Sequence, residues 1–225
     1  LEASQGVYVR YRAEEFYAIL ALESHRSKTI VVGEDLGTVP AYVRPAMSRH
    51  GLQRLYVLQY ELACNPQKPM SRIPPDSIAS LNTHDMPPFA AFWKASDIKE
   101  REAMRLLNGA SAQIEWRDRR YLKKALVTFL QSKGWLKGKA QDILAIIKAC
   151  LAFLSASQAR VVLINLEDLW LETQPQNIPS TREEYPNWRR KARYTLEAFC
   201  QMSEMRDTLR EVDTLREQSS LRVRS

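Results

Sequence analysis

The feature that most constrains the fold is an alternation of short, β-branched runs with longer segments of helical periodicity. Runs typical of strands lie at residues 29–34, 52–62, 77–85 and 159–169. The expected helices lie at residues 13–24, 38–51, 89–108, 121–132, 140–157 and 192–218. Strands that alternate with helices indicate a parallel sheet with helical crossovers, so the sequence predicts an α/β fold.

Two stretches near the N-terminus carry more detailed expectations. "TIVVGE" (29–34) begins with four β-branched residues, which is typical of a strand buried on both faces. In the helix expected at 38–51, Thr38 can cap the N-terminus and Gly51 can end the helix. Pro45 removes a backbone donor, so we expect it to kink this helix.

Polar residues stand at the C-terminal end of each expected strand. They are Glu34–Asp35, Gln59–Glu61, Asn82–His84–Asp85 and Glu167–Asp168. Parallel α/β enzymes place their active sites at this edge, and (β/α)8 barrels do so in almost every case. A complete barrel needs eight strands and about 250 residues, whereas this chain has 225 residues. The pattern therefore predicts half of a barrel with a C-terminal extension.

The composition restricts the class of protein and its partners. Hydrophobic residues make up 45% of the chain and charged residues 26%, as in ordinary globular proteins. No apolar run is long enough to cross a membrane, and the first residues lack a signal-peptide pattern and an initiator Met. The net charge of +7 is concentrated in "WRRKARY" (188–194) and the last five residues. No nucleic-acid-binding motif accompanies it, so we expect a solvated basic surface and no nucleic-acid partner.

The cysteine pattern bears on redox compartment and metal binding. Cys64, Cys150 and Cys200 are odd in number and form no CxxC motif, so neither a disulfide framework nor a zinc site is expected. Reduced thiols are typical of the cytoplasm, which is the expected location. Because the chain has three histidines, His84 beside Asp85 does not suggest a metal site.

Three motifs carry a resemblance to a known family. They are "VVGEDLGTVP", "SLNTHDMPPFAAFW" and "NLEDLWLETQPQN" followed by "PNWRRK". The first is weak by itself, but the three together, in this order, are specific. The sequence resembles the 4-α-glucanotransferases of glycoside hydrolase family 77, also called amylomaltases or disproportionating enzymes, over essentially its whole length.

The resemblance implies a fold, a reaction and roles for five residues. The reaction is retaining transfer of an α-1,4-glucan segment from one maltodextrin to the 4-hydroxyl of another sugar, on a (β/α)8 barrel and without a cofactor or metal. Retaining chemistry needs a nucleophile and a general acid/base, and the family adds a carboxylate that stabilises the transition state. By the family's motifs, Glu34 is the acid/base and Asp85 the stabiliser. His84, Asp35 and Asn82 are the expected substrate-binding residues.

The family's nucleophilic aspartate lies upstream of every matched motif, on the fourth barrel strand. The chain is therefore expected to supply strands five to eight, to pair with the missing N-terminal half of the barrel, and to be inactive alone. The expected domains are a partial barrel over residues 1–171, with a helical insertion around 95–157, and a C-terminal loop and helices over 172–225. The alternative is an inactive carbohydrate-binding or interaction remnant of a glucanotransferase.

The acids also have structural interpretations. A general acid must stay protonated near neutral pH, which requires burial or a neighbouring carboxylate. Adjacent strand residues point to opposite faces, so Asp35 is a poor neighbour for Glu34 and is better suited to orienting a loop or capping a helix. For Gln59 and Glu61, plain strand-end positions are favoured over barrel-mouth positions.

Three aromatic residues have two possible roles, and residues in the C-terminal loop carry structural expectations. Phe89, Phe92 and Trp93 could stack on glucose rings or pack into the core of a helix layer. The Asn187–Arg189 cluster is expected to fix the C-terminal loop. Many family members carry Gly where this chain has Ser180, which is a strained fit if that position requires a positive φ.

Overall fold

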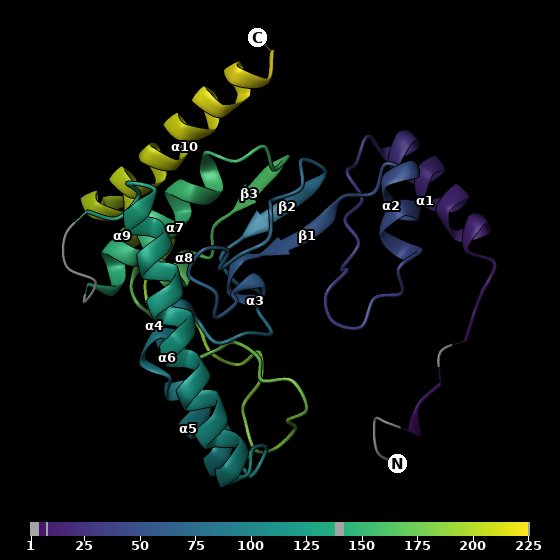
Figure 1. The fold of residues 1–225 in the computed structure, drawn as a ribbon. Helices are drawn as coiled ribbons and strands as arrows, with labels where there is room; N and C mark the ends of the chain where they lie inside the picture. The colour runs from purple at the N-terminus through teal and green to yellow at the C-terminus, as the bar shows by residue number, and fades with distance from the viewer. Residues whose placement is uncertain (1–4, 8, 138–141, 225) are drawn as a thin grey trace. The chain divides into compact units, whose positions relative to one another are not determined.

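The computed structural model describes residues 5–7, 9–137 and 142–224, and the chain divides into two compact units, Leu1–Leu55 and Tyr56–Ser225 (Figure 1). The elements are, in order, α1 (Ala13–Ser27), α2 (Val43–Arg49), β1 (Arg54–Val57), α3 (Leu58–Glu61), β2 (Ser77–Ser80), α4 (Phe89–Lys94), α5 (Ser96–Ala103), α6 (Gly109–Ser132), α7 (Ile143–Ser155), β3 (Val161–Leu163), α8 (Leu166–Leu169), α9 (Leu196–Gln201) and α10 (Ser203–Arg224).

In the first unit, the expected strand at 29–34 is reduced to a single parallel bridge between Val32 and Gln53. Gly33 N donates to Gln53 O and Gln53 N donates to Val31 O, both at 2.9 Å. Val32 is 41% exposed, so the prediction of a strand buried on both faces is wrong. The segment hydrogen-bonds to Gln53 along one edge only. A run of β-branched residues favours extended backbone, but it does not by itself provide a second strand to pair with.

The helix expected at 38–51 is shorter than predicted and begins at Val43. Its N-cap is Tyr42, which makes no side-chain capping bond, so the assignment of the cap to Thr38 is wrong. Pro45 is the third residue of α2, where a missing backbone donor removes no intrahelical hydrogen bond. The proline is therefore tolerated. Gly51 follows the helix with φ +72°, as expected for a residue that ends one.

The sheet has the strand order β1-β2-β3 (Figure 1). β2 and β3 are parallel, with Ile78 opposite Val161 and Ser80 opposite Leu163. This confirms the predicted parallel α/β arrangement for these strands. All three strands are shorter than expected, since 52–62 becomes β1 followed by α3, 77–85 is reduced to β2, and 159–169 becomes β3 followed by α8.

Local backbone and capping features set the boundaries of the helices between β2 and β3. The segment 89–108 divides into α4 and α5 at Ala95, which has φ +57°. α6 begins 12 residues before the expected 121–132 helix, where the Asn108 side chain accepts from Ser111 N at 2.8 Å. Asp142 caps α7 by accepting from the amides of Leu144 and Ala145. Capping thus fixes where these two helices start.

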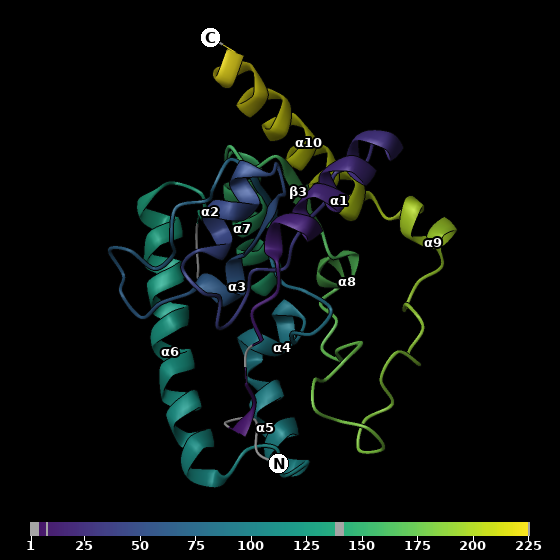
Figure 2. The same cartoon turned by 90° about the vertical axis from the view of Figure 1, so that its right-hand side faces the viewer.

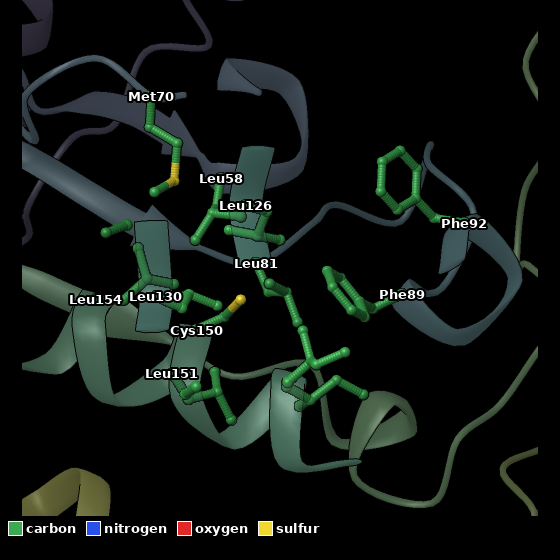
Figure 3. Close-up of a cluster of buried hydrophobic side chains, with 14 of the residues drawn as sticks. Leu58, Met70, Leu81, Phe89, Phe92, Leu126, Leu130, Cys150, Leu151 and Leu154 are labelled. Atoms are coloured by element: carbon green, nitrogen blue, oxygen red, sulfur yellow. The ribbon is translucent and has the colours of Figure 1, made fainter. Parts of the chain in front are cut away.

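The core of the second unit lies where α4, α6 and α7 meet the strands (Figure 3). Leu81, Phe89, Leu126, Leu130 and Leu151 are each no more than 1% exposed. Burial of a side chain of this size stabilises the fold by about 1.5–3 kcal/mol. Leu81 and Phe89 belong to this cluster, so the two ends of the segment between β2 and α4 are anchored.

The closing helical region expected at 192–218 consists of two helices, α9 and α10. α10 packs on α7, and its Arg216 donates to the carbonyl oxygens of Ser157 at 3.0 Å and Ala159 at 2.6 Å. These bonds hold the backbone just before β3. Figure 2 shows the segment between α8 and α9 as a long loop without regular structure. A loop was expected at the start of residues 172–225.

Candidate active site

The "THD" motif forms a tight turn that begins three residues after the end of β2, in a segment that we call the 83–88 loop. Asp85 N donates to Thr83 Oγ1 at 3.3 Å and Met86 N donates to Thr83 O at 3.2 Å. The turn leaves the His84 and Asp85 side chains 61% and 44% exposed, with His84 Nε2 3.4 Å from Asp85 Oδ2. Thr83 therefore shapes the backbone so that the two candidate residues face solvent together.

A second segment, 172–190, reaches the same place from the far end of the sequence. Asn177 Nδ2 donates to Asp85 Oδ1 at 2.6 Å. The Trp188 ring lies 5.2 Å from the His84 ring, centroid to centroid, at an interplanar angle of 52°. The structure thus brings together His84, Asp85, Asn177 and Trp188. Asn177 was not among the sequence-based candidates, although it is the last residue of "NLEDLWLETQPQN", one of the motifs that carry the resemblance.

Carboxylates tie the 172–190 segment to α8 and to itself. Glu167 Oε1 accepts from Gln176 Nε2 at 2.9 Å and from Arg190 NH2 at 2.7 Å, and Arg190 NH1 lies 3.3 Å from Glu172 Oε2. Burial by itself would raise the pKa of Glu172, but hydrogen bonds from the Gln174 and Thr173 amides and the charge of Arg190 outweigh it and lower the pKa. The segment is therefore tied down by paired charges.

Asn187 has the structural role that its sequence context suggested. Its Oδ1 accepts from Ile178 N at 2.9 Å and its Nδ2 donates to Thr181 Oγ1 at 2.8 Å. These bonds close the loop that contains Ser180, whose φ is +68°. The position therefore does adopt the left-handed conformation in which serine is strained.

A small cavity of about 70 Å³ opens beside the candidate residues. Asp85 and Asn177 line one part of it, and Glu100 and Arg101 of α5 line another. Burial, followed by the charge of Asp97, raises the pKa of Glu100. Acidic groups and an amide around a small cavity are suited to polar contacts with a hydroxylated ligand.

Asn82 makes its hydrogen bonds within the protein. It is 4% exposed, its Nδ2 donates to Asp168 Oδ2 at 2.8 Å, and its Oδ1 accepts from Asn165 Nδ2 at 3.2 Å. This arrangement suits a residue that supports the 83–88 loop. Asp168, which sequence reasoning noted but gave no role, is the partner that defines it.

Asp35 is the centre of an ion-pair cluster in the first unit. It is 2% exposed, its Oδ2 lies 2.9 Å from Nε of both Arg44 and Arg54, and its Oδ1 accepts from Leu55 N at 2.9 Å. Burial by itself would raise its pKa, but the amide and the two arginines outweigh that effect and lower it. Asp35 therefore orients its loop, the alternative that the strand geometry had favoured.

The acid next to it has the opposite environment. Glu34 is exposed within the first unit, whereas His84 and Asp85 lie in the second. The expectation that Glu34 and Asp85 act as the acid/base and the stabiliser of one reaction stays a prediction.

The remaining candidates are structural. Phe89, Phe92 and Trp93 are all at most 7% exposed, so the core interpretation of these aromatics is correct. Gln59 is 6% exposed and its Nε2 donates to Pro87 O at 3.1 Å, which makes it a further support of the 83–88 loop. Among the described residues, no three His, Cys, Asp or Glu side chains lie close enough together to hold a metal ion.

The fold and the site define the class of protein: an α/β protein with acids and amides clustered near the ends of its strands. Comparison with known proteins identifies the family. The sequence profile of the 4-alpha-glucanotransferase family, glycoside hydrolase family 77, matches residues 1–196. The 4-alpha-glucanotransferase of Haemophilus influenzae is 32% identical over 196 residues, which are 84% of this chain and 28% of that protein. The chain belongs to the 4-alpha-glucanotransferase family.

Solved structures agree with this fold. The amylomaltase of Corynebacterium glutamicum matches with a TM-score of 0.78 at 22% identity, covering 91% of this chain and 32% of that one. The amylomaltase of Streptococcus agalactiae, solved in complex with acarbose, matches with a TM-score of 0.65 at 14% identity, covering 96% and 37%. The chain spans about a quarter of the length of the curated relatives it matches.

Proposed function

We propose that the chain is the C-terminal portion of a retaining 4-α-glucanotransferase that transfers α-1,4-glucan segments between maltodextrins. The single observation that carries this proposal is the contact of Asp85 with Asn177, which joins the "THD" loop to the "QPQN" segment across 92 positions. Two family motifs far apart in sequence thus meet at one carboxylate. Membership of the family and the ligand of the S. agalactiae amylomaltase support a glucan as substrate.

The proposed architecture is the second half of a (β/α)8 barrel, strands five to eight, with its partner half outside this chain. Residues 1–171 would form the partial barrel, with a helical insertion around 95–157, and 172–225 would pack on it. The parallel pairing of β2 with β3 and the one-third coverage of the C. glutamicum chain support this proposal. Such a half leaves the cleft to be completed by the other half.

We assign three residues to direct contact with the sugar. Asp85, half-exposed and held by Asn177, would stabilise positive charge that develops at the anomeric carbon. His84 beside it would hydrogen-bond a sugar hydroxyl. Glu34 would protonate the leaving oxygen and then activate the acceptor hydroxyl. Because Glu34 is exposed within its unit, bound glucan or the rest of the protein must supply the water-excluding surroundings that a general acid needs.

Asp35 and Asn82 have positioning roles in this proposal. Asp35 fixes the backbone that carries Glu34 through its two arginines and the Leu55 amide. Asn82 fixes the backbone that precedes the "THD" turn. Neither needs to touch the substrate directly to be required for the reaction.

The cytoplasm is the proposed location. Cys64, Cys150 and Cys200 all lie in described parts of the chain and are free thiols, which is the state expected in a reducing compartment. In the described part of the chain, no helix combines the length and the apolar character that membrane crossing demands.

The test compares this 225-residue chain with the full protein that its gene encodes, using maltotriose as substrate. We expect the full protein to produce both longer and shorter maltodextrins and this chain alone to produce neither, because the nucleophile lies upstream. Disproportionation by this chain alone would show that the nucleophile has been misplaced. An inactive full protein, or a gene that encodes no further segment, would favour the alternative of an inactive carbohydrate-binding remnant.

A further inference from the structure

We propose that Asp168 is a positioning residue that holds both ends of the 83–88 loop and thereby fixes His84 and Asp85 for the reaction. The assignment of a role to the loop rests on the proposed function. The positioning itself rests on hydrogen bonds that do not involve His84 or Asp85. Asp168 acts through its neighbours and does not touch the sugar.

The two carboxylate oxygens of Asp168 bind one residue on each side of the loop. Oδ2 accepts from Asn82 Nδ2 at 2.8 Å, and Oδ1 accepts from Phe89 N at 2.7 Å. Asn82 directly precedes the loop and Phe89 directly follows it. Asp168, Asn82 and Phe89 are 1%, 4% and 0% exposed, so water does not compete for these bonds.

The pairing of the strands explains why this contact forms. Ser80 lies opposite Leu163 in the parallel β2–β3 ladder, and the same register two residues further on aligns Asn82 with Asn165. Asn165 Nδ2 donates to Asn82 Oδ1 at 3.2 Å, and Asn165 Oδ1 accepts from Glu167 N at 3.2 Å as the cap of α8. These bonds turn the donor side of the Asn82 amide toward Asp168.

Gln59 in α3, directly after the strand on the other side of β2, completes the support. Its backbone amide donates to Leu81 O at 3.0 Å, and its side chain donates to Pro87 O at 3.1 Å. The loop is thus held from the ends of both flanking strands. Its tip, with His84 and Asp85, is left exposed, while its ends are anchored beside Leu81 and Phe89 of the core (Figure 3).

Asp168 is a buried carboxylate whose two hydrogen bonds come from uncharged amides, an arrangement that costs free energy. Burial, the largest effect, raises the pKa of Asp168 to about 6, although the Phe89 amide and Asn82 lower it, and the charge of Glu167 raises it further. The thiol of Cys150 on α7 also faces this group. A carboxylate is the side chain that can accept from two donors at once, which is what holding both ends of the loop requires.

The test depends on the fact that a carboxylate has two acceptor oxygens, whereas a side-chain amide has one acceptor and one donor. In Asp168→Asn, the new amide can accept from Asn82 or from Phe89 but not from both, because its second polar atom is a donor. A double variant, which we call the exchanged pair, combines Asn82→Asp with Asp168→Asn. In it, the amide at position 168 donates to the new carboxylate at position 82 and accepts from Phe89 N, while that carboxylate still accepts from Asn165. Asp142→Asn is the control, since it makes the same chemical change at the N-cap of α7.

The measurement is amide hydrogen exchange over residues 82–89 in the full gene product, with glucan transfer measured in parallel. We expect Asp168→Asn to speed exchange of the Phe89 amide by about 10- to 100-fold. The exchanged pair should restore the rate to within about threefold of the wild type. In glucan transfer, kcat should fall in Asp168→Asn with little change in KM, and the pair should recover it.

Several results would overturn the proposal. Exchange in Asp168→Asn that matches Asp142→Asn would show that Asp168 does not hold the loop. Faster exchange that the exchanged pair fails to correct would show that burial of charge, and not the two hydrogen bonds, is what matters. A wild-type protein that transfers no glucan would defeat the proposed function, yet the exchange rates would still decide the positioning.

Discussion

Glu34–Asp35 and Glu167–Asp168 are the same dipeptide in two regions of the chain, and each stands at the C-terminal end of a segment expected to be a strand. In both regions the aspartate is buried and accepts a hydrogen bond from a backbone amide, that of Leu55 for Asp35 and that of Phe89 for Asp168. The glutamates differ, because Glu34 is exposed whereas Glu167 is bound to Arg190 and Gln176.

The aspartates also differ in their second partners. Asp35 has two arginines, and its pKa is lowered despite burial, whereas Asp168 has an asparagine, and burial raises its pKa to about 6. In both copies of the dipeptide the aspartate is the buried residue. The side chains that the fold packs around each aspartate determine whether its pKa is lowered or raised. Four measurements test whether the two acidic pairs differ in this way.

The largest effect is expected for the glutamates. Glu34→Gln in the full gene product should lower glucan transfer by about 10²- to 10⁴-fold, because an amide cannot deliver a proton to the leaving oxygen. Glu167→Gln should lower it by less than about 10-fold, since the amide can still accept from Arg190. Maltotriose disproportionation measures both. Glu23→Gln, at an exposed pair with Arg26, is the control, and equal losses at Glu34 and Glu167 would end the distinction between them.

The next effect concerns the arginine cluster. Asp35→Asn should lower the free energy of unfolding by about 2–4 kcal/mol, because it leaves Arg54 and the partly exposed Arg44 without their shared carboxylate. Urea unfolding measures this change. The control is Asp118→Asn, whose exposed pair with Arg117 should be worth no more than about 0.5 kcal/mol. A loss at Asp35 no larger than the loss at Asp118 would show that the cluster is incidental.

The opposite pKa shifts predict opposite dependences of stability on pH. Folded Asp168 holds its proton up to about pH 6, while the unfolded chain releases it near the ordinary aspartate pKa of 3.8, so the folded state binds more protons in between. Its contribution to stability is therefore complete below that lower value and is lost as the pH rises to about 6, by about 3 kcal/mol at most.

The contribution of Asp35 has the reverse sign, since it is present above the ordinary aspartate pKa and is lost as the pH falls through its lowered folded value. Urea midpoints of the wild type and Asp168→Asn between pH 4 and 7 isolate the first effect, because other groups titrate in both proteins. A difference between the two that does not change with pH would contradict the raised pKa of Asp168.

The smallest effect is expected at Ser180, in the segment that Glu167 ties down. Ser180→Gly should stabilise the protein by up to about 1 kcal/mol, because glycine adopts φ +68° without the steric penalty of a β-carbon. Thermal unfolding measures it. Ser180→Ala keeps the β-carbon and should give no gain, and equal stability of the glycine and alanine variants would mean that the backbone there is not strained.

Periodicity predicted the parallel strands and most of the helices, and the polar residues at a strand end together with the family resemblance singled out His84 and Asp85. The sequence-based prediction failed for residues 29–34, where a β-branched run forms one bridge with Gln53. It also failed for the start of α2, because proline at the third helical position and proline in a helix interior look alike until the first turn is known. Boundaries of this kind depend on caps and neighbours more than on composition.

The site was only partly visible in the sequence. Asn177 and Trp188 lie about a hundred residues from His84 and Asp85, and no local pattern states that they meet. The role of Asp168 was hidden for the same reason, since Asn82 and Phe89 lie about 80 residues away. For Asp35, the sequence suggested a loop-orienting role but did not identify Arg44 and Arg54 as its partners.

The α/β class, the family motifs and the side chains available for acid chemistry were all evident from the amino-acid sequence. The tertiary structure alone decided that Asp168 binds both ends of the 83–88 loop and that Asp35 is neutralised by Arg44 and Arg54. The physical reason is that secondary structure follows from local backbone and side-chain preferences. Hydrogen bonds and charge states are set by whichever distant groups the folded chain buries together.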